Sequence, residues 1–68
     1  MNDTIREQLR ALYQCGIPYA HIARLVGVDR SHISHYANGN ENASFVLEMR
    51  IIEAIRQIKD DIKSIGGF

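Results

Sequence analysis

The side chains with the clearest chemistry lie between residues 30 and 36, where hydrogen-bonding groups recur at short spacing. Arg30 is followed by Ser31, Ser34 and His35. A guanidinium can donate two parallel hydrogen bonds to guanine O6 and N7, which gives roughly 1–3 kcal/mol of discrimination between bases. Serine and histidine can bond to base edges or to phosphates. These residue types in this pattern predict a surface that contacts double-stranded DNA.

The same residues share one face of a helix that we predict over residues 30 to 37. At helical spacing Ile33 and Tyr36 point inward, which leaves the polar side chains outside. In a helix-turn-helix the second helix of the pair lies in the major groove. We therefore assign base contacts to the outward positions, which are Arg30, Ser31, Ser34 and His35. His32 on the flank and Tyr19 on the preceding helix are candidates for contacts with the DNA backbone.

A second short helix, predicted from Pro18 to Val26, must position this surface. Proline suits the first helical residue because its missing N–H would have no partner there. Ala23 is small enough for a close helix crossing, and Gly27 suits a turn that needs a left-handed backbone. Asp29 can cap the following helix with its carboxylate. This order of residues is typical of a helix-turn-helix.

Two further helices complete the predicted fold. Thr4 and Glu7 fit a capping box at the start of a helix over about residues 4 to 15. After a polar loop, Ser44 is a plausible cap for one continuous helical pattern to about Ser64. We predict a single all-α domain over residues 1–68, a small helix-turn-helix domain of four helices whose last helix is long and amphipathic. Residues 44–65 are also expected to form a dimerisation helix.

The long helix carries two sets of apolar residues. The first set can cover the helix-turn-helix from below: Phe45, Val46, Leu47, Met49 and Ile52. The second set alternates at spacings of four and three, as in a coiled-coil seam: Ile51, Ile55, Ile58, Ile62 and Ile65. These isoleucines can pack on the chain's own first helix or on a second copy. We favour a homodimer because a helix of about 20 residues is about 30 Å long and should project beyond so small a body. Parallel, antiparallel and four-helix arrangements all stay open.

The charge balance limits how the chain can bind DNA. Its 68 residues carry eight Lys and Arg and eight Asp and Glu, so the net charge is zero, whereas DNA-binding domains usually carry a basic excess. Residues 16 to 40 hold Arg24, Arg30 and three histidines against Asp29 alone. The predicted DNA-contacting surface is therefore weakly positive, and we expect modest affinity for non-specific DNA.

Other classes of function lack their usual residues. Paired carboxylates, a nucleophile elbow and a phosphate-binding glycine loop are not found, so we expect neither enzyme activity nor a cofactor. His32 and His35 lack a third ligand, and we expect no metal site. Cys15, the one cysteine, suits a small packing position. No run of about 18 apolar residues predicts a membrane span. We expect a cytoplasmic protein with no small-molecule ligand.

Four dipeptides resemble the Cro/cI-like, XRE-type helix-turn-helix repressors of phages and bacteria: Ile22-Ala23, Gly27-Val28, Ile33-Ser34 and Asn38-Gly39. The resemblance covers about residues 5 to 52. It implies base reading by Arg30, Ser31 and His35, and a phosphate contact by Asn38. Residues 29 to 34 also resemble the same segment in controller proteins of restriction-modification systems. The family's usual fifth helix is missing, which suggests a different dimer.

These observations lead to two expectations about function. The first is a transcriptional regulator of the repressor type that binds a palindromic operator in double-stranded DNA as a homodimer. The second is a protein-interaction module on a helix-turn-helix scaffold, such as an antirepressor or an inhibitor of a host factor. Zero net charge is the best support for the second.

Overall fold

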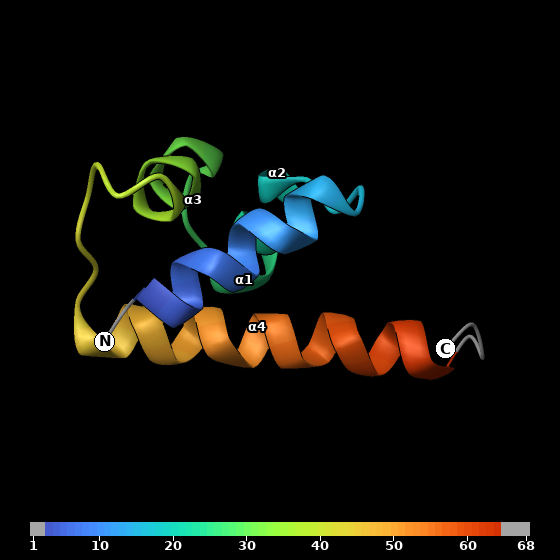
Figure 1. Cartoon of the computed structure of the whole chain (residues 1–68). Coiled ribbons are helices and arrows are strands. Elements are labelled where there is room, and N and C mark those ends of the chain that lie inside the picture. The colour runs from blue at the N-terminus through green and yellow to red at the C-terminus, as the bar shows by residue number, and fades with distance from the viewer. Residues whose placement is uncertain (1–2, 65–68) are drawn as a thin grey trace.

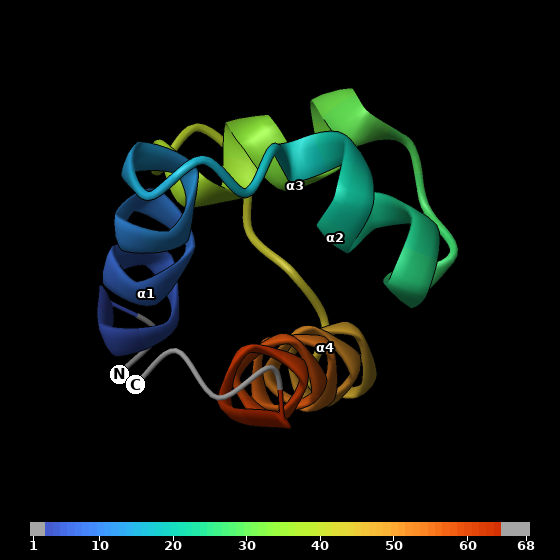
Figure 2. The same cartoon turned by 90° about the vertical axis from the view of Figure 1, so that its right-hand side faces the viewer.

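The computed structural model describes residues 3–64, and these form four α-helices without a β-strand. The helices are α1 (Asp3–Gln14), α2 (Tyr19–Val26), α3 (Arg30–Ala37) and α4 (Phe45–Ser64). The all-α fold with a long last helix is therefore confirmed. Figure 1 shows α4 running beneath the other three helices, and in the view along α4 all four surround a common interior (Figure 2). Within the described residues, no helix is long and apolar enough to cross a membrane.

The turn between α2 and α3 forms as its residues predict. Gly27 has a left-handed backbone, with φ 93° and ψ 30°, and its N–H donates to the Ala23 carbonyl at 2.7 Å. The prediction for Asp29 is wrong, because its side chain makes no capping hydrogen bond. Its carbonyl instead accepts from the His32 N–H at 3.1 Å. Pro18 is also one position off, since it precedes α2 instead of starting it.

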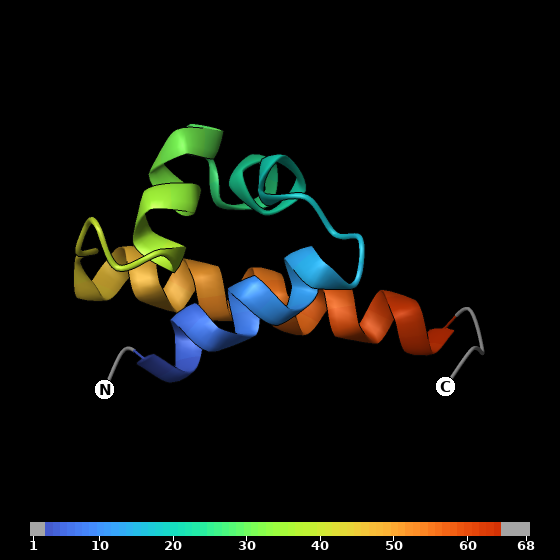
Figure 3. The ribbon, with the colours of Figure 1, turned by 45° about the horizontal axis from the view of Figure 1, so that its top comes forward.

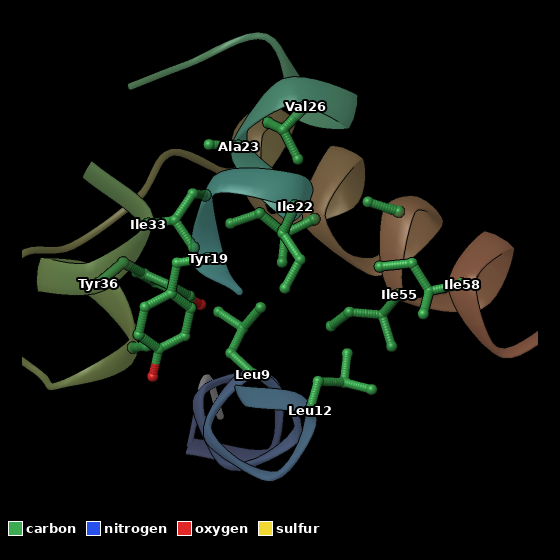
Figure 4. Packing of buried hydrophobic residues seen from close by; sticks show 13 residues of the cluster. Leu9, Leu12, Tyr19, Ile22, Ala23, Val26, Ile33, Tyr36, Ile55 and Ile58 are labelled. Atoms are coloured by element: carbon green, nitrogen blue, oxygen red, sulfur yellow. The ribbon is translucent and has the colours of Figure 1, made fainter. Parts of the chain in front are cut away.

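All four helices contribute to one hydrophobic core. Figure 4 shows Ile55 of α4 pointing toward Leu12 of α1 and Ile22 of α2. The buried set consists of Leu9, Leu12, Tyr19, Ile22, Ala23, Val26, Ile33, Tyr36, Ala37, Ile51, Ala54, Ile55 and Ile58. Figures 1 and 3 place α3 toward the N-terminal end of α4 and α2 toward its middle.

The predicted isoleucine seam lies mainly inside this core. Ile51, Ile55 and Ile58 are buried within the single chain, and Ile62 is partly buried against the same cluster. Ile65 lies outside the described residues. Ile51, Ile55 and Ile58 are therefore not exposed to a second copy in this fold, whereas dimerisation of the chain stays a prediction. They pack against the chain's own helices, which was the alternative interpretation.

In the first half of α4, the side that was predicted to be buried is exposed. Four residues expected to cover the helix-turn-helix are exposed instead: Phe45, Val46, Met49 and Ile52. Leu47 alone of that set packs against the core. At about 100° per residue the two stripes lie on opposite sides of the helix. The isoleucine stripe is apolar along most of the helix, whereas the other is apolar only over its first turns, so the longer stripe faces the core. We call the exposed set the apolar face of α4.

Candidate nucleic-acid interface

Helix α3 presents the predicted residues outward. Its inner residues Ile33, Tyr36 and Ala37 are 0% exposed, which fixes the rotation of the helix about its axis. Arg30, Ser31 and His35 are exposed, whereas Ser34 and His32 are half-buried. Asn38, which follows the helix, is exposed as well. The structure thus brings the predicted base-contact candidates together on one side of α3.

Two arginines of α1 hold the C-terminal end of α3. Arg6 Nε donates to the Tyr36 carbonyl at 2.8 Å, and Arg10 Nη1 donates to the Ala37 carbonyl at 2.6 Å. The last carbonyls of a helix have no partner within it, so these side chains satisfy them. Neither arginine was singled out by the sequence. Their four-residue spacing puts them on one face of α1, and this was the only available signal.

Tyr36 links α3 to both neighbouring helices. Its hydroxyl donates to Glu48 Oε2 on α4 at 2.9 Å, and the Arg6 guanidinium carbon lies 4.6 Å from the centre of its ring. Burial, followed by the hydrogen bond to Glu48, raises the pKa of Tyr36 to about 12. The phenol is therefore held in its neutral, donating form. The contacts of Arg6, Arg10 and Glu48 together restrain α3 relative to α1 and α4.

An open groove of about 500 Å³ runs beside the outward face of α3. On α3 and just after it, Arg30, Ser34 and Asn38 line the groove at four-residue intervals. Arg10 of α1 lines the groove as well, so arginines from two helices border it. The remaining lining residues are Tyr13, Gln14, Pro18 and Tyr19. Among these described lining residues none is acidic, and the groove therefore favours an anionic group such as a phosphate.

Tyr19 was predicted to contact the DNA backbone. Only 9% of it is exposed, and its ring stacks on Tyr13 with 4.6 Å between ring centres. Burial raises the pKa of Tyr19. Tyr19 thus serves mainly to pack α1 against α2, although it still lines the groove. Tyr13, which the sequence did not single out, is the more exposed aromatic residue here.

The two histidines of α3 face an acidic residue from the following loop. His32 Nδ1 lies 3.2 Å from Glu41 Oε1, and His35 Nδ1 lies 3.7 Å from Glu41 Oε2. This carboxylate was not foreseen beside the predicted DNA-contacting surface, and its charge opposes phosphate at that flank. Within residues that the structure describes, no group of three or more His, Cys, Asp or Glu side chains is arranged to hold a metal ion.

Comparisons of the chain with protein-family models, with curated proteins and with solved structures found no match.

Proposed function

We propose that this chain is a sequence-specific regulator of transcription, of the repressor type, that binds double-stranded DNA through α3. The observation that carries the proposal is the outward row of Arg30, Ser31 and His35 on a helix whose inner residues are fully buried. A helix that reads bases in the major groove needs hydrogen-bond donors at fixed positions. The side chains of the restrained α3 would supply them. Arg30 is the residue best suited to select a guanine.

The groove beside α3 supports the same proposal through phosphate contacts. Asn38 and Arg10 line it together with Arg30, so a DNA strand alongside α3 would meet amide and guanidinium donors. Such contacts set the position of the protein on the duplex without selecting bases. His32 would contact the backbone from the opposite flank, where Glu41 Oε1 lies 3.2 Å from its Nδ1. Zero net charge for the whole chain limits the affinity for non-specific DNA.

Two copies of the chain would bind a palindromic operator. Paired recognition helices enter successive major grooves about 34 Å apart. The described part of one chain measures 35 × 23 × 21 Å, so neighbouring copies fit half-sites at this spacing. Repression would follow from occupying a promoter.

The test compares Arg30→Ala with Lys63→Ala, which removes the same charge from the far end of α4. Each protein is titrated at low salt with a duplex enriched from a randomised library and with the same duplex altered at one base pair. Arg30→Ala should reduce the discrimination at one base pair per half-site by roughly 5- to 150-fold. Lys63→Ala should discriminate as the wild type does. Unchanged discrimination by Arg30→Ala would remove Arg30 from the base contacts.

A second candidate function is a protein-interaction module, such as an antirepressor or an inhibitor of a host factor. The observation in its favour is the exposed apolar face of α4, since exposed apolar patches often mark protein contacts. This function requires no DNA affinity. A folded sample that enriches no duplex from the library would favour it.

A further inference from the structure

The apolar face of α4 has no partner among the described residues of this chain. Phe45 is 75% exposed, Val46 62%, Met49 49% and Ile52 38%. The face lies opposite the buried isoleucine stripe, so it points away from α1 and α2. A partner seated on it would leave the outward side chains of α3 uncovered.

We propose that a second copy of this chain packs on the apolar face of α4, with the two helices antiparallel and crossing at Met49. A two-fold contact places the same patch on both subunits, so a face of this kind can pair with itself. Met49 then meets the partner's Met49, and Phe45 lies against the partner's Ile52. This inference extends the homodimer of the proposed function by giving it a surface.

The charges along α4 favour the antiparallel arrangement. The stripe that begins with Phe45, Met49 and Ile52 continues at spacings of four and three residues through Arg56, Lys59 and Lys63. In a parallel pair Arg56 and Lys63 would lie against the same residues of the partner, which is unfavourable for like charges. Lys59 Nζ instead donates to Gln8 Oε1 on α1 at 3.4 Å. An antiparallel pair that crosses at Met49 joins the apolar turns and separates the basic ends. Glu53, which lies 3.8 Å from Arg56, and the exposed Asp60 are on the same side of α4, so one positive charge remains in excess there.

The net charge of the chain is compatible with a second copy as the partner, and the area of the face predicts how strong the contact is. The chain has zero net charge, so no overall repulsion opposes a second copy. The exposed side chains of the face present on the order of 400 Å² of surface. Two copies would bury roughly 800 Å², less than the roughly 1,200–2,000 Å² of stable complexes, which predicts a weak, reversible dimer.

Sedimentation at increasing protein concentration, without DNA, tests the surface. From roughly 10 μM to 1 mM, the range suited to a weak contact, the average mass should rise above the 7.7 kDa of one chain. Met49→Glu places a charge at the centre of the contact and should weaken association at least tenfold. Gln57→Glu makes the same charge change on an exposed part of α4 beyond the contact, and it should associate as the wild type does. Circular dichroism establishes that both variants are folded.

A wild type that stays monomeric at 1 mM would overturn the proposal. Equal association by Met49→Glu and the wild type would overturn it too. Neither outcome bears on α3, because DNA is absent from the experiment, so failure here is distinct from failure of the proposed function.

Disulfide cross-linking tests the direction of the two helices. Cys15 is exposed, so both probes are made in a Cys15→Ser background. Met49→Cys should cross-link readily in a glutathione redox buffer, because the two thiols meet at the two-fold axis. Lys63→Cys should remain unlinked, since antiparallel packing separates these positions. Equal cross-linking at both positions would indicate parallel helices and contradict the proposed arrangement.

Discussion

Two isoleucines of α4, three residues apart, should respond very differently to the same truncation. Ile55 is 3% exposed and lies in the core against α1 and α2, whereas Ile52, about 60° away around the helix, is 38% exposed and belongs to the apolar face. Ile55→Ala removes buried carbon atoms and leaves a cavity, which costs about 2–5 kcal/mol in comparable cores. Ile52 is already partly hydrated, so its truncation should cost less than about 1 kcal/mol in the monomer.

The free energy of unfolding is measured by urea denaturation, followed by circular dichroism at a protein concentration of roughly 5 μM, well below that needed for a weak contact. The change in helix propensity is the same for both variants, so it cancels in the comparison. We expect Ile55→Ala to be less stable than Ile52→Ala by at least about 1.5 kcal/mol. Equal losses, or a larger loss for Ile52→Ala, would refute the assignment of the two faces of α4.

Wild-type stability, relative to Tyr36→Phe, should fall as the pH rises from about 10 to about 12, because the folded state holds the phenol proton more tightly; pH-dependent denaturant titrations should show a change of roughly 2–3 kcal/mol. The added methyl group of Gly27→Ala meets no neighbouring atom within 4 Å. The variant should therefore lose about 1–2 kcal/mol of the free energy of unfolding through the left-handed backbone alone. A thermal melt that matches the wild type would contradict this. His35→Ala should weaken DNA binding, measured by fluorescence anisotropy, because it removes an outward hydrogen-bonding side chain of α3; unchanged affinity would take His35 out of the DNA contacts.

The parts of the fold that were predicted from the sequence depend on local geometry. Gly27 adopts the left-handed turn expected of it, and Ala23 is buried where a small residue was expected. The outward face of α3 also follows from spacing alone, because Ile33 and Tyr36 fix which side is inward. Ser44 caps α4 as predicted, accepting a hydrogen bond from the Leu47 N–H at 3.1 Å.

The parts that were missed depend on contacts between distant residues. The first turns of α4 carry apolar residues on both sides, and their spacing does not determine which side meets α1 and α2. The exposure of Met49 and the burial of Ile51 are settled by tertiary packing. Arg10 is likewise 27 residues from the Ala37 carbonyl that it binds, so helical periodicity carried no sign of that contact.

The proposed reading of DNA sequence by α3 is tested by selection from a randomised duplex library at low salt. Purified wild-type protein is incubated with the library, and the retained duplexes are sequenced. The proposed function predicts enrichment of a two-fold symmetric motif, whose half-site spacing reports the distance between recognition helices. A folded sample that enriches no motif would contradict the claim.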